Sequence, residues 1–337
     1  MEYLPLVSII CTAYNHETFI KDALEGFVMQ KTNFPFEIII SDDASTDKTA
    51  SIIKQYEINH TQLFKTFYHK ENQYSKNIPF FYDELIKNAR GKYIALCEGD
   101  DYWTDPLKLQ KQVDFLEVNE DFGIVHADCN YYIEKINQWE YHTSKNLTNN
   151  FPIKNKKDIF YRLIDATYKI RTATAVFRKD LLEKIKPDDL TFLMGDTPMW
   201  LNFSQLTNFK YFDEVFAVYR IVGESASRSK NKNKQFRFSL SMAEMRVYYS
   251  KKFSYPINDS LKTRYNDALM TYKLFNNNYK EIFPLFEPSI YQHLKLKALN
   301  INILRHYFLF SFIIFNYLQL IKNKIRLFKF ANRTSPR

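Results

Sequence analysis

The first hundred residues alternate between short apolar runs and stretches with helical periodicity. The runs have the length of β-strands, and the stretches between them repeat apolar residues every three or four positions. The runs are 7–14, 36–40, 64–68 and 93–97; Asn15, Ser45 and Pro79 are suited to start the intervening helices. This alternation predicts an α/β fold, with a Rossmann-like, mainly parallel sheet flanked by helices.

Polar clusters follow three of these runs, at the points where the strands would end. They are Thr12 to Asn15, Asp42 with Asp43, and Glu98 with Asp100 and Asp101. The carboxyl ends of parallel strands meet at one edge of a sheet, where ligands bind in such folds. The sequence therefore predicts a single ligand site at this edge.

The strongest of the three clusters has three acids within four residues, directly after a buried strand. Carboxylates this close repel one another unless a cation lies between them. Oxygen ligands suit Mg²⁺ or Mn²⁺, ions that share their coordination shell with phosphate oxygens. The alternative is a polar turn that caps the next helix.

The sequence has no glycine-rich phosphate-binding loop. A nucleotide would therefore be held by carboxylates, an aromatic ring and a metal ion. Asp43 is suited to accept hydrogen bonds from a uracil imide or a ribose hydroxyl, and Tyr14 to stack on the base. The alternative for Asp42 and Asp43 is an ordinary strand-to-helix loop.

The composition and net charge of the chain limit the classes of molecule that it can bind. The 337 residues, 45% of them hydrophobic, suffice for one large domain with an appendage or for two domains. A net charge of +9 fits a nucleic-acid binder, a protein at an anionic membrane, or an enzyme of phosphorylated substrates. The three cysteines lie in apolar runs, and residues 1–6 lack a signal-peptide pattern. These features predict a cytoplasmic protein with reduced thiols.

Three segments together resemble a known family. Segments 7–15 (VSIICTAYN), 41–49 (SDDASTDKT) and 91–103 (GKYIALCEGDDYW) follow one another in the order found in inverting family 2 glycosyltransferases, which have the GT-A fold. The match continues through 104–112. It is close over about residues 5–130 and looser to about residue 220.

The resemblance implies a role for several residues of the predicted edge. It places Thr12 and Tyr14 in the nucleotide pocket and Asp43 against the uracil. It makes Asp101 the direct ligand of Mg²⁺ or Mn²⁺ and puts Asp100 near the ribose or the sugar. Where the family carries an arginine before the third helix, this chain offers Lys76.

Glu98 and Asp196 are the remaining site residues implied by the resemblance. Glu98 stands where many relatives carry Asp, and it either contacts the donor sugar or shapes the loop. Asp196 matches the catalytic base of the family, and its neighbours Met199 and Trp200 would raise its pKa by desolvation. The alternative for Asp196 is a helix N-cap.

Outside these motifs, three further features carry alternatives. His126, in an apolar run, is explained more simply as a core histidine than as a site residue. Arg228 is a solvated charge or a contact for the diphosphate. Residues 211–220 alternate like an edge strand.

The basic run 230–234 is the predicted domain boundary. We expect a glycosyltransferase domain over 1–229, with a nucleotide-sugar half over about 1–130 and an acceptor half over about 131–229, and a helical region over 230–337. Within the latter, residues 307–330 combine apolar, aromatic and basic side chains. They suit a helix lying on an anionic membrane, or one packed on its own domain or on a second subunit.

The residues and the resemblance together predict a metal-dependent, inverting hexosyltransferase. Its donor would be a nucleotide sugar, and a UDP-sugar is the first candidate. Its acceptor would be a hydroxyl group of a glycan or lipid-linked sugar in bacterial surface polysaccharide synthesis. It would act in the cytoplasm, free or at the inner face of the membrane. The alternatives are a nucleotidyltransferase acting on a sugar phosphate and a non-catalytic nucleic-acid-binding module. We expect no nucleic-acid partner, because the acids cluster at strand ends.

Overall fold

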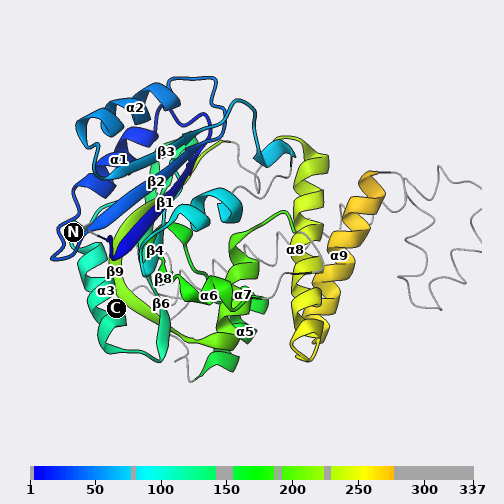
Figure 1. Cartoon of the computed structure of the whole chain (residues 1–337). Helices are drawn as coiled ribbons and strands as arrows, with labels where there is room; N and C mark the ends of the chain where they lie inside the picture. The colour runs from blue at the N-terminus through cyan, green and yellow to red at the C-terminus, as the bar shows by residue number, and fades with distance from the viewer. Residues whose placement is uncertain are drawn as a thin grey trace, which may run out of the picture. The chain divides into compact units, whose positions relative to one another are not determined.

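The computed structural model describes residues 4–76, 81–141, 155–185, 188, 192–223 and 229–276. In this part of the chain the strands form one nine-stranded sheet, in the order β3-β2-β1-β4-β8-β6-β9-β5 with β7 paired to β6. Helices cover both of its faces (Figure 1). The predicted α/β fold with a mainly parallel sheet is confirmed.

The first half of the sheet is parallel, as its sequence predicts. The strands β1 (Val7–Ala13), β2 (Phe36–Asp42), β3 (Phe64–Tyr68) and β4 (Tyr93–Leu96) pair with parallel registers such as Ile9 opposite Ile38. The helices α1 (Ile20–Val28) and α2 (Thr49–Asn59) follow the first two strands and lie together beside them (Figure 1).

The second half of the sheet is mixed. The strand β8 (Val176–Arg178) runs antiparallel between β4 and β6 (Phe122–Ile133), and β6 is parallel to β9 (Asn208–Ile221). The two-residue strand β5 (Tyr102–Trp103) pairs with β9 on its other side. The expectation that 211–220 form an edge strand is therefore wrong, because β9 has a neighbour on each side.

The remaining elements are helices and short turns. They are α3 (Lys108–Val118), α5 (Lys156–Ile164), α6 (Asp180–Glu183), α7 (Asp196–Leu206), α8 (Lys232–Lys252), α9 (Asp259–Phe275), η1 (Tyr74–Lys76), η2 (Phe81–Ile86), η3 (Glu134–Ile136), η4 (Thr172–Thr174) and β7 (Gln138–Glu140). Among the described residues, no helix combines the length and apolar character that crossing a membrane requires.

The central strands are buried on both faces, so successive residues belong to different cores. On β1, Ile10 packs in one core with Phe177 and Trp200, whereas Ile9 packs in the other with Phe27. Strands buried on both sides read as continuous apolar runs, which is why the sequence identifies them so clearly.

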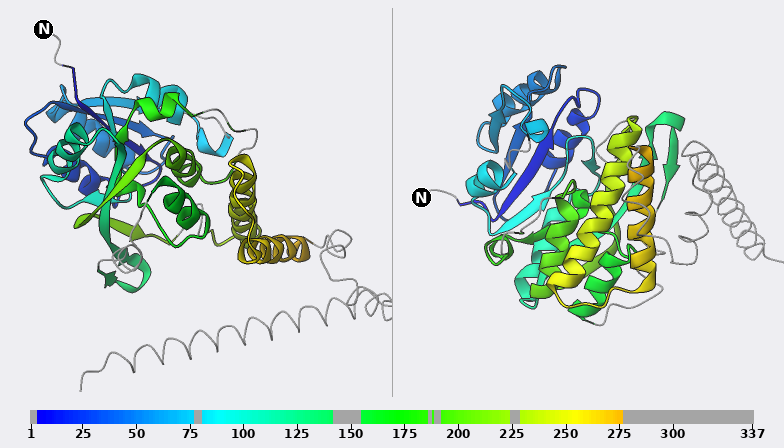
Figure 2. Two further views of the ribbon diagram at one scale, coloured as in Figure 1. Left: turned by 90° about the horizontal axis from the view of Figure 1, so that it is seen from below. Right: turned by 90° about the vertical axis from the view of Figure 1, so that its right-hand side faces the viewer.

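Helix α8 belongs to the same compact unit as the sheet. Met245 and Tyr249 on α8, and Leu261 on α9, are fully buried in the core that contains Trp200. Figure 2 shows α8 beside the green helices of residues 156–206 in both views, and Asn202 on α7 donates a hydrogen bond to the Tyr249 hydroxyl (2.9 Å).

The compact unit continues to Leu269, well beyond the boundary expected after residue 229. The basic run that suggested a linker begins α8 instead, where the Asn231 side chain accepts a hydrogen bond from the Lys234 N–H. The second unit comprises 270–337. The expected membrane-binding helix over 307–330 and Arg228 both lie outside the described residues.

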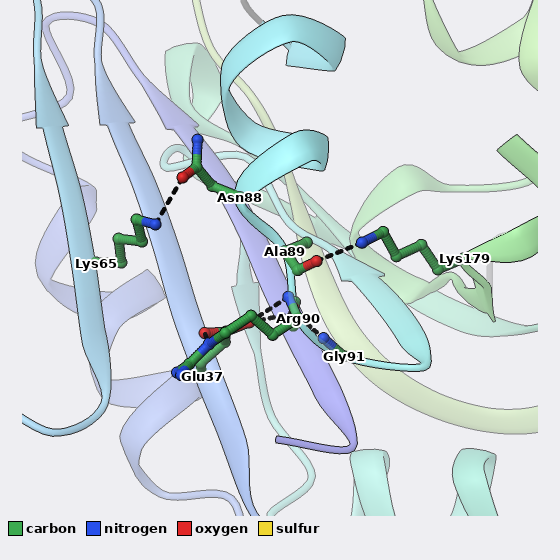
Figure 3. A network of polar contacts seen from close by, with 8 residues as sticks. Glu37, Lys65, Asn88, Ala89, Arg90, Gly91 and Lys179 are labelled. Atoms are coloured by element: carbon green, nitrogen blue, oxygen red, sulfur yellow. Dashed lines mark hydrogen bonds and ion pairs between the residues drawn. The ribbon is translucent and has the colours of Figure 1, made fainter. Parts of the chain in front are cut away.

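The amino edge of the sheet is closed by a satisfied polar network (Figure 3). Glu37, buried at the start of β2, accepts hydrogen bonds from the Ser8 hydroxyl (2.6 Å) and from the Arg90 N–H (2.7 Å), and forms an ion pair with the Arg90 Nε (2.9 Å). The Gly91 N–H donates to the same Ser8 hydroxyl (2.8 Å). This network connects β1, β2 and the entry to β4, and every partner is supplied by the chain itself.

Candidate functional site

The carboxyl edge of the sheet brings the three predicted polar clusters together. The Asp43 N–H donates to the Ala13 carbonyl (2.9 Å), and the Gly99 N–H donates to the Thr12 carbonyl (2.9 Å). Gly99 lies in the loop that carries Glu98, Asp100 and Asp101 (the acid loop). A Cβ atom on Gly99 would lie only 2.9 Å from the His16 Nδ1, so glycine lets the acid loop approach β1 closely without displacing this side chain. The ends of β1, β2 and β4 therefore meet as the sequence predicts.

At the end of β2, the acids are engaged by the backbone. Asp43 is 3% exposed; its Oδ1 accepts from the Gln73 N–H (2.6 Å) and its Oδ2 from the Tyr74 N–H (3.1 Å). Asp42 accepts from the Ser45 N–H (3.2 Å). Each carboxylate oxygen keeps a further lone pair, so Asp43 can still accept a hydrogen bond from a nucleotide.

Two other predicted nucleotide-binding residues lie at the rim of this edge. Tyr14, just after β1, is 45% exposed, which leaves its ring available for stacking. Lys76, at the end of η1, is exposed and forms an ion pair with Glu71. A contact between Lys76 and a donor phosphate would have to replace or share this partner.

At the end of β4, by contrast, the acids repel one another. Burial raises the pKa of Glu98 to about 8, and the charges of Asp100 and Asp196 add to this rise. Asp101 is only 2% exposed, and burial, followed by the charges of Asp100 and Glu98, raises its pKa well above the ordinary value. A nearby positive charge would relieve the repulsion among these carboxylates.

Arg220 is a site residue that the sequence analysis missed. Its backbone N–H donates to the Asp101 Oδ1 (2.8 Å) and its Nη1 to the Asp100 carbonyl (3.0 Å). Its guanidinium forms an ion pair with Asp22 and lies 4.3 Å from the centroid of the Tyr102 ring. Arg220 therefore fixes the acid loop, while its side-chain charge is already matched by Asp22.

The carboxylate oxygens at this edge suit one class of divalent cation, Mg²⁺ and its analogues. Within the described residues, no three His, Cys, Asp or Glu side chains are arranged as a preformed metal cage. Mg²⁺ and its analogues are instead bound by one or two carboxylates together with phosphate oxygens of the substrate. The mutually repelling Asp100 and Asp101, which follow the end of β4, suit that kind of site.

Asp196 begins α7, and its carboxylate faces the acid loop closely enough to raise the pKa of Glu98. Its Oδ1 accepts from the Thr197 N–H (2.6 Å), and the Thr172 hydroxyl lies 3.5 Å from its Oδ2. The N-cap position is occupied by Gly195, without a capping side chain, so the alternative that Asp196 serves as the N-cap is not what the structure shows.

Two histidines, His126 and His16, lie in different surroundings. His126 is fully buried on β6, is bonded to the Tyr168 hydroxyl, and has its pKa lowered to about 3 by burial. It is therefore a neutral core residue, as expected. His16, which the sequence analysis did not select, has a buried Nδ1 without a partner, and burial lowers its pKa although Asp100 opposes this effect.

The comparisons with known proteins agree with the sequence motifs. The model of the family described as Glycosyl transferase family 2 matches residues 8–185, more than half of the chain. An uncharacterized protein of Mycobacterium bovis is 49% identical over 111 residues, which are 33% of this chain and 31% of that protein.

Two further similarities have functional names. The Escherichia coli protein WfaP, named UDP-Glc:alpha-D-GlcNAc-diphosphoundecaprenol beta-1,3-glucosyltransferase, is 37% identical over 132 residues, 39% of this chain and 48% of that protein. The chain thus spans less than half the length of either relative. Staphylococcus aureus TarS 1–349 in complex with UDP-GlcNAc aligns with a TM-score of 0.49 at 15% identity, over 78% of this chain and 79% of that one.

Proposed function

Since this chain belongs to glycosyl transferase family 2, we propose that it transfers a sugar from a UDP-sugar to a hydroxyl group of a glycan or lipid-linked acceptor. The observation that carries this proposal is the group of repelling carboxylates Glu98, Asp100 and Asp101 at the edge that also holds Thr12 and Asp43. The name of the E. coli relative supports a UDP-sugar donor and a lipid-linked acceptor. A role in bacterial polysaccharide synthesis is supported by the name of the Bacillus subtilis relative TuaG, which includes the words teichuronic acid biosynthesis glycosyltransferase.

Asp101 and Asp100 are the residues that would hold Mg²⁺ or Mn²⁺. Bound there with the donor diphosphate, the ion would stabilise the negative charge that develops on the leaving UDP. Arg220 keeps Asp101 in place through its backbone N–H, and Gly99 keeps the loop against β1. Thr12, Tyr14 and Asp43 would hold the nucleotide at the ends of β1 and β2.

Asp196 is the general base of the proposed reaction. Its carboxylate takes the proton from the acceptor hydroxyl as that oxygen attacks the anomeric carbon from the face opposite UDP, so the configuration inverts. Thr172 and the Thr197 N–H hold the carboxylate at the start of α7. The charge of Asp196 contributes to the raised pKa of Glu98. In the proposed complex, Glu98 would lie beside the donor sugar.

The proposal is tested by following UDP release from a panel of UDP-sugars, with and without glycan acceptors. We expect Asp196→Asn to lower kcat by about 10²–10⁴-fold while the affinity for UDP stays within threefold. The control is Asp114→Asn, on the exposed face of α3, which should retain full activity. An Asp196→Asn enzyme with near-normal kcat would exclude this base, and no UDP release from any UDP-sugar would contradict the donor class.

A further inference from the structure

An arginine and two tyrosines gather at the same edge of the sheet, beyond the residues that the reaction uses. Tyr131 and Tyr219 are directly paired near the carboxyl ends of the parallel strands β6 and β9. Arg171 immediately precedes η4, which leads into the antiparallel strand β8. The first residue of β8, Val176, pairs with Ala95 near the end of β4, and Arg171 lies before it against Tyr131 and Tyr219, so all three residues belong to the carboxyl edge.

The contacts of Arg171 are aromatic rather than acidic. Its guanidinium carbon lies 4.8 Å from the ring centroid of Tyr131 and 4.9 Å from that of Tyr219, and Nη2 donates to the Tyr131 hydroxyl. The Nε is buried without a partner. In the described part of the chain, no Asp or Glu forms an ion pair with Arg171, in contrast to the guanidinium of Arg220.

This group is connected to the proposed reaction centre at two points. Thr172, the next residue after Arg171, has its hydroxyl 3.5 Å from the Asp196 carboxylate. Arg220, the next residue after Tyr219, donates its N–H to Asp101. Arg171, Tyr131 and Tyr219 are each half-buried, so a ligand at the edge can still reach them.

Charge distinguishes this group from the rest of the edge. The acid loop and Asp196 provide the negative charge of the site, and the ring faces of the tyrosines attract the cation without neutralising it. An arginine that lies near aromatic rings still has N–H groups for hydrogen bonding, and those groups match the oxygens of phosphate or carboxylate. Among the described residues, no Asp or Glu supplies such a group to Arg171.

We propose that Arg171, together with Tyr131 and Tyr219, forms an acceptor subsite that binds an anionic group, phosphate or carboxylate, on the acceptor sugar. The inference rests on the proposed function, because it takes Asp196 as the base that receives the proton of the same acceptor. It gives Arg171 a binding role: the anionic group anchors the acceptor so that its hydroxyl lies at Asp196. The tyrosine rings provide the surface against which the sugar packs.

The test uses the full chain saturated with UDP and Mn²⁺, so that the donor edge is filled. Three probes are titrated calorimetrically: glucose 1-phosphate, glucuronic acid and methyl glucoside. We expect at least one anionic probe to bind ten times more tightly than methyl glucoside. Arg171→Gln should remove this preference and Arg171→Lys should retain part of it, and the stronger of the two anionic probes identifies phosphate or carboxylate.

Two controls separate binding from packing. Arg237→Gln removes an arginine that pairs with Glu244 on α8, away from this group, and should leave the preference intact. Tyr131→Phe keeps the ring but loses the hydroxyl, and should change the affinities by less than threefold. Equal affinity of the wild type for all three probes, or an unchanged preference in Arg171→Gln, would overturn the proposal.

The same titrations separate this proposal from the proposed function. If UDP does not bind, the donor assignment fails, and the probes are then titrated without UDP. The preference for an anionic sugar and its dependence on Arg171 are measured in either case.

Discussion

The two edges of the sheet each hold a glutamate in a different environment: Glu37 at the amino edge is buried, and Glu98 at the carboxyl edge is partly buried. At the amino edge, Glu37 accepts hydrogen bonds from Ser8 and Arg90 and forms an ion pair with Arg90. At the carboxyl edge, Glu98 lies among like charges, which together with burial raise its pKa to about 8. The first arrangement serves the fold, whereas the second costs stability and suits an external cation and a ligand.

The largest effect on stability is expected at the amino edge. Glu37→Gln removes the negative charge that pairs with Arg90 and accepts a hydrogen bond from the Ser8 hydroxyl. This change should lower the free energy of unfolding by about 3 kcal/mol. Urea unfolding at pH 7 measures this change, with Glu120→Gln, an exposed residue, as the matched control. A loss below about 1 kcal/mol would mean that the network is not what stabilises this edge.

A smaller effect of opposite sign is expected at the carboxyl edge. With a pKa of about 8 in the folded protein and an ordinary value of 4.5, Glu98 keeps its proton in the folded state while the unfolded chain loses it. Stability should therefore fall as the pH rises from about 4.5 to 8. Glu98→Gln removes this dependence. The full pKa difference corresponds to about 4 kcal/mol at pH 8, and because solvent screens the partly exposed Glu98 we expect a stabilisation of about 2 kcal/mol, with little change at pH 5.

Urea unfolding at the two pH values, in the presence of a chelator, measures this difference. The Glu120→Gln control should show the same dependence on pH as the wild type. A Glu98→Gln variant that is less stable than the wild type at pH 8 would show that the carboxylate is compensated within the chain, and the contrast between the two edges would be lost.

The sequence predicted the half of the fold in which local pattern and tertiary structure agree. Strands buried on both faces give continuous apolar runs, and polar clusters after them predicted the edge at which Thr12, Asp43 and Asp101 meet. The motifs of this half also carry the family resemblance. The ligand roles of these residues stay predictions, because geometry alone does not show what binds.

The sequence could not predict features that depend on distant partners. Arg220 contacts Asp22 and the acid loop because β5 and β9 pair across more than a hundred residues, and the same pairing removes β9 from the edge. Lys108 and Gln112 are fully buried on α3, where the Lys108 Nζ donates to Gln112 (2.8 Å) and lies 4.1 Å from the Trp103 ring centroid. A polar residue on a helix normally indicates a solvated face.

The basic run at the predicted domain boundary lies within the compact unit for a related reason. A run of lysines and asparagines has the composition of a linker, but here it forms the first turn of α8, whose later residues Met245 and Tyr249 lie in the core. Composition reports the average polarity of a segment. It does not report which few side chains of a helix are buried.

The central claim is that the acids after β4, Glu98, Asp100 and Asp101, bind a cation together with a nucleotide diphosphate. It is tested most directly by calorimetric titration of UDP, with and without Mn²⁺, into the wild type and Asp101→Ala. We predict that Mn²⁺ strengthens UDP binding at least tenfold in the wild type, and that Asp101→Ala abolishes this effect while leaving the protein folded. UDP binding that is indifferent to Mn²⁺, or a Mn²⁺ effect that survives in Asp101→Ala, would contradict the claim.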